Sequence, residues 1–151
     1  MAKAKRGPRR QYAALPWRQE GEGLQVLLIT SRETRRWVLP KGWRKKGEPP
    51  TITAAREALE ETGAGGRVHE APLGEYRYQK LMKNGVVQRV RVTVFALEVL
   101  FEHEDWPERD QRQKLWTTAE HAARLVDEPD LQVLIAAFTP GEPGSANLSK
   151  I

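Results

Sequence analysis

Three glutamates on one short segment are the residues of this sequence best suited to chemistry. They lie in TITAAREALEET, residues 51–62, whose composition favours an α-helix. At about 100° per residue, Glu57, Glu60 and Glu61 fall within one arc of roughly 100° on that helix. Like charges spaced in this way oppose helix formation unless a cation offsets them. Because carboxylate oxygens are preferred ligands of Mg²⁺ and Mn²⁺, the pattern favours a divalent metal site.

The same segment also predicts how the helix packs. Ile52, Ala55, Leu59 and Thr62 lie opposite the acidic face, so we expect this stripe to be buried and the acidic face to be exposed. Arg56 can pair with a glutamate four residues later, but one arginine cannot neutralise three carboxylates. Taken alone, the segment is also typical of a solvated acidic surface.

The residues around the helix extend the pattern. Over 23 positions the chain reads Gly42, five residues, Glu48, seven residues, Arg56-Glu57-Ala58, one residue, Glu60-Glu61, one residue and Gly63-Ala64. This run resembles the Nudix box, G-x5-E-x7-R-E-U-x-E-E-x-G-U, with alanine at both apolar U positions. The resemblance implies an α/β protein with the Nudix-type α/β/α sandwich and a mixed sheet. It also implies a hydrolase that cleaves a diphosphate linked to another moiety.

The resemblance further implies roles for individual residues of the box. Glu57 and Glu61 would be the principal metal ligands, joined by the backbone carbonyl of Lys41. Glu60 would be a further ligand or the base that activates water. Arg56 would orient the carboxylates together with Glu48, which makes Glu60, Glu57 and Arg56 the expected catalytic set. The expected cofactor is Mg²⁺, or Mn²⁺ in its place.

A second resemblance narrows the expected substrate. Ser31-Arg32 followed by Arg36-Trp37-Val38-Leu39-Pro40 is similar to the Nudix branch that hydrolyses diphosphoinositol polyphosphates and diadenosine polyphosphates. The run Arg112-Gln113-Lys114-Leu115-Trp116 matches the basic pair that this branch carries before a later tryptophan. The resemblance therefore implies a small-molecule polyphosphate substrate, bound by Arg32, Lys41, Arg112 and Lys114. Lys41 stands where the branch usually has glycine, and it is followed by Arg44, Lys45 and Lys46. These extra cations suit a highly anionic substrate, and they are equally typical of a solvated loop.

Two further assignments stay open at this stage. The aromatic residues that could stack a base are Trp43, Tyr76 and Tyr78, although each is also typical of strand packing. The acids that could supply a further ligand or a general base are Glu102, Glu104, Asp105 and Glu108. Glu108 is slightly favoured because Asp105-Trp106-Pro107-Glu108 resembles a loop in bacterial members of the branch.

Other functions are compatible with the same box. Within enzymes, the alternatives are hydrolysis of nucleoside triphosphates, of ADP-ribose or nucleotide sugars, or of the pyrophosphate at an RNA 5′ end. An alternative of another class is a nucleotide- or RNA-binding Nudix module without turnover. The complete set Glu57, Glu60 and Glu61 favours an enzyme, since a pure binding module does not need it.

The elements that position the box follow from local patterns. We expect strands over 11–19, 24–30 and 37–39, a loop over 41–50, and the helix 51–62 ended by Gly63. Strands over 67–80 and 86–101 should be joined by Asn84-Gly85, a strong hairpin signal. A charged loop over 102–114, a strand over 115–117 and helices over 118–126 and 130–138 complete the prediction. This order indicates a mixed α/β layer fold.

Composition limits the class of protein. The chain has 151 residues and no cysteine, which excludes disulfides, thiolate metal sites and cysteine nucleophiles. We expect one domain over 11–139, a basic disordered tail over 1–10 and a flexible tail over 140–151. The net charge of +5 equals the charge of residues 1–10, so the remainder is balanced and nucleic acid is an unlikely partner. No apolar run is long enough to span a membrane and no signal peptide is visible, so we expect a cytoplasmic protein of unknown oligomeric state.

Overall fold

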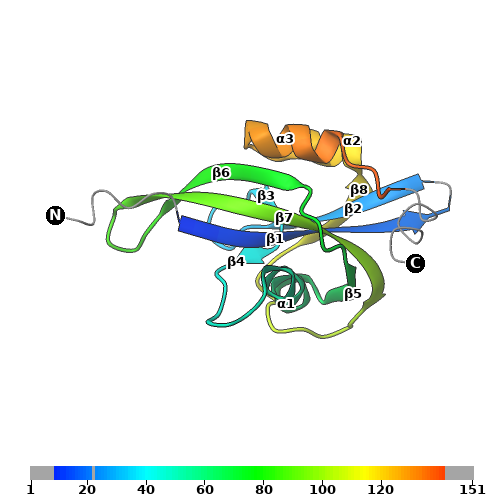
Figure 1. The fold of residues 1–151 in the computed structure, drawn as a ribbon, viewed down its shortest axis with the longest axis horizontal. Helices are drawn as coiled ribbons and strands as arrows, with labels where there is room; N and C mark the ends of the chain where they lie inside the picture. Colours follow the sequence, from blue (N-terminus) through cyan, green and yellow to red (C-terminus); the bar gives the residue numbers. More distant parts are fainter. Residues whose placement is uncertain (1–8, 22, 142–151) are drawn as a thin grey trace.

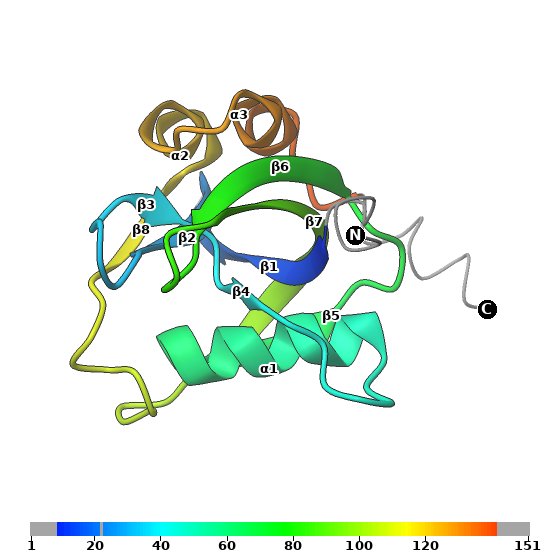
Figure 2. The same cartoon turned by 90° about the vertical axis from the view of Figure 1, so that its left-hand side faces the viewer.

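One mixed β-sheet with helices on both faces organises the molecule (Figures 1 and 2). The structure is a computed structural model, and it describes residues 9–21 and 23–141. Helix α1 (Pro50–Thr62) covers one face, and α2 (Ala119–Leu125) and α3 (Pro129–Ala136) cover the other. The predicted α/β/α sandwich with a mixed sheet is confirmed.

The sheet is built around two long parallel strands. In chain order the strands are β1 (Arg9–Glu20), β2 (Gly23–Thr30), β3 (Trp37–Val38), β4 (Lys41–Gly42), β5 (Ala64–Val68), β6 (Gly74–Leu81), β7 (Val87–Glu102) and β8 (Lys114–Thr118). β1 and β7 run parallel, β2 and β4 pair antiparallel with β1, and β5 and β6 pair antiparallel with different stretches of β7. β3 and β8 both pair with β2.

Most predicted elements are present, with three changes of boundary. The strand predicted over 67–80 is two strands, β5 and β6, separated by residues 69–73, where Pro72 has no N–H for a sheet ladder. Part of the predicted loop 41–50 is the short strand β4. β1 begins at Arg9, so the last two residues of the predicted basic tail are in a strand. The rest of that tail and residues 142–151 lie outside the described residues.

Local signals explain both ends of α1. Pro50 occupies the first turn, where a missing N–H costs nothing and the fixed φ suits a helix. Gly63 ends the helix in the left-handed region at φ 79°, and its N–H donates to the Leu59 carbonyl at 3.0 Å. The Asn84-Gly85 hairpin is also confirmed, with Gly85 at φ 85°.

The buried face of α1 differs from the prediction. The helix buries Ala54 and Ala58 against Ala14, Phe95 and Leu97 of the sheet. The larger side chains of the predicted stripe stay accessible instead: Ile52 is 52% exposed and Leu59 is 36% exposed. Small residues let the helix approach the sheet closely, and this packing outweighs the hydrophobicity of the larger residues. The choice of face brings Glu61 inside the protein, contrary to the expectation of an exposed acidic face.

The loop between β7 and β8 wraps around the end of α1. His103 N–H donates to the Gly63 carbonyl at 2.9 Å, and Glu108 N–H donates to the Glu60 carbonyl at 3.1 Å. These bonds pair carbonyls in the last turn of the helix that have no partner within the helix. The indole of Trp106 lies directly against Gly63. We call residues 103–113 the clasp loop.

The contact between Gly63 and Trp106 gives a stability prediction. A methyl group at Gly63 would lie 2.6 Å from Cε3 of Trp106 and would be attached to a left-handed backbone. Gly63→Ala should therefore lower the free energy of unfolding by about 1 kcal/mol for the backbone strain and by roughly 1–3 kcal/mol more for the overlap. Urea unfolding monitored by circular dichroism measures the change.

Gly47→Ala is the matched control. Gly47 has nearly the same φ, +77°, but a methyl group there has no neighbour within 4 Å. This variant should show the backbone cost alone. Equal losses in the two variants would contradict a tight contact between the clasp loop and the end of α1.

Candidate active site

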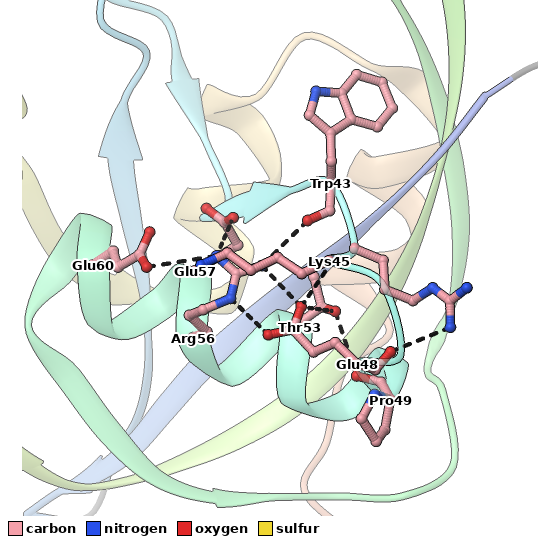
Figure 3. A network of polar contacts seen from close by, with 9 residues as sticks. Trp43, Lys45, Glu48, Pro49, Thr53, Arg56, Glu57 and Glu60 are labelled. Carbon is pink, nitrogen blue, oxygen red and sulfur yellow. Dashed lines mark hydrogen bonds and ion pairs between the residues drawn. The ribbon is translucent and has the colours of Figure 1, made fainter.

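Arg56 is the centre of a polar network that joins the box loop to α1 (Figure 3). Its Nε and Nη2 donate to the two carboxylate oxygens of Glu48 at 2.7 and 2.9 Å. Its Nη1 donates to Glu57 at 2.9 Å and lies 3.5 Å from Glu60. Nη2 also donates to the Trp43 carbonyl at 3.2 Å. One guanidinium thus fixes the loop, the helix and the Glu57 carboxylate together.

Glu48 is the anchor of this network. Besides the bidentate arginine contact, it accepts hydrogen bonds from the Thr53 hydroxyl at 2.7 Å and from the Lys45 N–H at 3.1 Å. Hydrogen bonds from Arg56 and then from Thr53 hold the pKa of Glu48 well below its usual range. The hydrogen bond with Glu48 also raises the pKa of Arg56. The predicted orienting pair is therefore assembled in the structure.

Glu57 and Glu61 form a buried carboxylate pair. Glu61 is only 4% exposed, and burial followed by its contact with Glu57 raises its pKa well above the usual value. A Cβ atom at Gly42 would overlap the Glu57 carboxylate, so only glycine fits at this position of β4. The glycine that opens the box thus makes room for a carboxylate of the helix.

Lys41 places a cation beside this pair. In β4 it is the register partner of Ala13 on β1, which brings its side chain over the ring of Tyr78, 4.7 Å from the ring centroid. Burial lowers the pKa of the Lys41 ammonium to about 8, while the charge of Glu61 opposes this shift. The ammonium and the buried carboxylates therefore face a common region.

Glu60 differs from its two neighbours on the helix. Its side chain is 37% exposed, so it is the solvent-accessible acid of the three. Of the three predicted glutamates, the structure therefore brings two into a buried contact and leaves the third at the surface beside Arg56.

The predicted phosphate-binding residues fall into two groups. Arg112 and Lys114 are held by the protein: Arg112 donates to Glu108 and to the Thr30 carbonyl, and Lys114 donates to the Thr62 carbonyl and to Glu102. Arg32 is exposed, and its one side-chain contact among the described residues is a 3.3 Å hydrogen bond to Gln111 of the clasp loop. Sequence reasoning missed Thr30 and Gln111, which no motif indicates.

The four candidate acids differ in their exposure and contacts. Glu102 belongs to β7 and pairs with Lys114 at 2.8 Å, and Glu104 and Asp105 are exposed. Glu108 is the one of the four whose N–H bonds to the box helix, and its carboxylate accepts from Arg112 at 2.7 Å. The spacing of Glu108 and Arg112 by four residues was the one sequence signal that could have predicted this pair.

The three candidate aromatic residues do not share one environment. Tyr76 is 2% exposed in the core under α2 and α3, so it is not available to stack on a base and that assignment is wrong. Trp43 is half-buried, with the Arg9 guanidinium 4.3 Å from its ring centroid. The Tyr78 hydroxyl donates to Gln11 at 2.6 Å.

Comparison with known proteins identifies the family. The family model described as the NUDIX domain matches residues 7–138. The chain belongs to the Nudix family. It is 35% identical over 105 residues to "Nudix hydrolase 12, mitochondrial" of Arabidopsis thaliana, which covers 68% of this chain and 52% of that protein. The chain thus spans about half the length of this relative.

Two further Nudix proteins extend the comparison. The mouse diphosphoinositol polyphosphate phosphohydrolase 3-alpha is 30% identical over 122 residues, covering 80% of this chain and 70% of the relative. The crystal structure of an Ap4A hydrolase from C. elegans superposes with a TM-score of 0.60 at 20% identity, covering 94% of this chain and 99% of that one. At that identity the second likeness shows the Nudix fold alone.

Nudix enzymes generally use divalent metals, and the buried pair suits one. Two carboxylates in contact inside a protein repel each other unless one of them keeps a proton or a cation lies beside them. Within residues 9–21 and 23–141, no group of three or more histidine or acidic side chains is placed so that it could hold a metal ion as a cage of protein ligands. Mg²⁺ does not need such a cage, because it is commonly bound by one or two carboxylates with waters and substrate phosphates. Glu57 and Glu61 therefore fit the cation that the family implies.

The helices give no sign of a membrane span. None of those in the described part of this Nudix chain has the length and apolar character needed to traverse a bilayer.

The Glu48 network predicts a pH-dependent stability difference. Because the folded-state pKa of Glu48 is depressed, its contribution is complete above the unfolded value of about 4.3 and is lost as the pH falls below it. Glu48→Gln should therefore melt at a lower temperature than the wild type at pH 7, and the gap should narrow toward pH 3. Thermal melts at pH 7, 5 and 3 measure this gap.

Glu70→Gln, in the exposed turn between β5 and β6, is the control and should match the wild type at each pH. A gap for Glu48→Gln that stays constant from pH 7 to pH 3 would rule out the ionised network as its source.

Proposed function

We propose that this Nudix chain is a Mg²⁺-dependent hydrolase that cleaves a phosphoanhydride bond. The observation that carries the proposal is the buried contact between Glu57 and Glu61, flanked by Lys41 and Arg112. Burying two carboxylates side by side lowers the stability of the folded protein. The arrangement therefore needs an explanation other than stability. A metal-bound state in which the cation joins them explains the arrangement.

The residues of the box and Lys41, which precedes it, would have different roles in the reaction. Glu57, Glu61 and the Lys41 carbonyl would hold the metal, and Arg56 would keep Glu57 in place through the bond at 2.9 Å. When bound, the metal polarises phosphoryl oxygens and lowers the pKa of bound water. Glu60, the accessible acid, would serve as a further ligand or take the proton from the attacking water. The water oxygen bonds to phosphorus, and the bridging oxygen leaves with the other phosphate.

The proposed substrate is a small molecule rich in phosphate, such as a diadenosine polyphosphate or a diphosphoinositol polyphosphate. Support comes from the exposed Arg32, from the ammonium of Lys41 beside the carboxylates, and from the named activity of the mouse relative. The contacts of Arg112 and Lys114 with the protein leave Arg32 and Lys41 as the leading phosphate-binding residues. A cytoplasmic location stays a prediction, since the Arabidopsis relative is named as mitochondrial.

A substrate panel tests this proposal. Release of phosphate and of nucleotide products should be measured with and without Mg²⁺ for a diadenosine polyphosphate, a diphosphoinositol polyphosphate, ADP-ribose, a nucleoside triphosphate and a 5′-triphosphorylated RNA. Metal-dependent turnover of the first two classes is the expected result. Ligand binding without turnover would favour a non-catalytic module, and faster hydrolysis of ADP-ribose would contradict the substrate class.

Removal of one buried carboxylate should separate activity from stability. Glu61→Gln should reduce turnover on the order of 100-fold or more, since even residues that only support metal ligands cost 10–100-fold. The metal-free variant should melt no lower than the wild type, because the substitution relieves repulsion between two buried carboxylates. Steady-state kinetics and thermal melts measure the two effects.

Glu120→Gln on the exposed side of α2 is the control for charge removal. Near-normal turnover in Glu61→Gln would refute the ligand assignment.

Arg32 gives a test of substrate choice. Arg32→Ala should raise KM for polyphosphate substrates about tenfold, because a charge-assisted contact with phosphate is worth roughly 1.5–3 kcal/mol. The effect on ADP-ribose, which has two phosphates, should be smaller. The change in stability should stay within about 0.5 kcal/mol, since the side chain is exposed.

Arg67→Ala on β5, an exposed arginine paired with Glu98, is the charge-matched control. Equal losses for all substrates together with a lower melting temperature would instead assign Arg32 a purely structural role.

A further inference from the structure

Arg112 is the least exposed cation of the clasp loop, and each part of its guanidinium has a partner. Its side chain is 10% exposed. Nε donates to Glu108 at 2.7 Å, and Nη1 donates to the Thr30 carbonyl at the end of β2 at 3.1 Å. Nη2 lies 3.8 Å from Oε1 of Glu61, close enough for charge attraction but beyond hydrogen-bonding distance.

The partners of Arg112 are themselves fixed to the box helix and the sheet. The N–H of Glu108 donates to the Glu60 carbonyl, one residue before Glu61. Thr30 is tied to the loop on its other side, since its hydroxyl accepts from the Gln113 N–H at 2.9 Å and its own N–H donates to the Gln113 carbonyl at 3.1 Å. The guanidinium is thus held from two directions, and its third side is directed at Glu61.

We propose that Arg112 is a positioning residue for Glu61, and that Glu108 acts through it. The proposal rests on the proposed metal role of Glu61. A planar guanidinium suits this task because it offers five donors in fixed directions and can hold two partners while it faces a third. An ammonium is a compact point charge and has no such fixed arrangement.

The alternative role for Arg112, a direct phosphate contact, has less support from the geometry. A phosphate-binding arginine needs donors that face an accessible site. In Arg112 two donor groups are occupied by protein oxygens, and the remaining one faces a carboxylate that is itself buried. Arg32, which is exposed and donates to Gln111 at 3.3 Å, is better placed for an incoming anion.

The test is Mn²⁺ binding to the substrate-free protein, measured by calorimetry and by the electron paramagnetic resonance signal of free Mn²⁺. Arg112→Met and Arg112→Lys should both weaken Mn²⁺ binding by about 10-fold or more, the range for residues that orient metal ligands. Glu108→Gln should weaken it in the same direction by a smaller factor. Arg109→Met is the matched control, since Arg109 lies in the same loop but its side chain is exposed and forms, among the described residues, one ion pair, with Asp105 at 3.8 Å. It should bind Mn²⁺ like the wild type.

Kinetics separates positioning from phosphate binding. In Arg112→Lys, kcat should fall at limiting metal and recover at saturating metal, while KM for the substrate stays within about twofold. A raised KM with unchanged Mn²⁺ affinity would overturn the proposal and make Arg112 a phosphate ligand. If Arg112→Met does not fold, the proposal is tested with Arg112→Lys and Glu108→Gln. Unchanged Mn²⁺ affinity in both of these variants would overturn the proposal.

Glu61→Gln distinguishes this inference from the proposed function. Loss of Mn²⁺ binding in Glu61→Gln with full binding in Arg112→Lys would overturn the positioning role alone. Full Mn²⁺ binding in Glu61→Gln would refute the metal site itself, and the positioning role with it.

Discussion

The contact between the carboxylates of Glu57 and Glu61 is the constraint on which the site depends. Two like charges buried together are unfavourable, and the energy of their interaction grows as water is removed. Three cations from separate parts of the chain lie near the pair and offset its charge: Arg56 on α1, Lys41 on β4 and Arg112 on the clasp loop. The pair therefore draws its compensating charge from a helix, a strand and a loop that are distant in the sequence.

The two arginines support the pair in different ways. Arg56 makes a direct hydrogen bond to Glu57 at 2.9 Å, which fixes one oxygen of that carboxylate. Arg112 stops 3.8 Å short of Glu61 and supplies charge without taking up a hydrogen-bonding position on it. The Glu57 carboxylate is therefore held in place by a hydrogen bond, while the charge of Arg112 offsets part of the cost of burying Glu61 without bonding to its oxygens.

The sequence was sufficient for the elements whose signals are local. Alanine-rich helix 51–62 with Gly63 at its end, the Asn84-Gly85 hairpin and the order of strands and helices could all be predicted from neighbouring residues. The resemblance to the Nudix box also implied the Glu48–Arg56 pair, which the structure contains. What failed depended on partners far away in the chain. The buried face of α1 was chosen by Ala14, Phe95 and Leu97 on two strands, and this choice reversed the expected exposure of Ile52, Leu59 and Glu61. The burial of Tyr76 could not be predicted for the same reason, because distant strands and helices decide which side chains they cover.

The burial of Glu61 follows from that choice of helix face. Ala54 and Ala58 lie four residues apart and define the line along which α1 touches the sheet. Ala58 precedes Glu61 by three residues, so a helix that buries this alanine turns the glutamate toward the protein as well. Glu57 and Glu60 lie on the same side of that line as Glu61 but further around the helix, the first facing Gly42 and the second facing solvent. Small residues on one helical line thus set three glutamates at three depths: Glu57 is held by Arg56, Glu61 is buried beside it and Glu60 stays accessible to solvent.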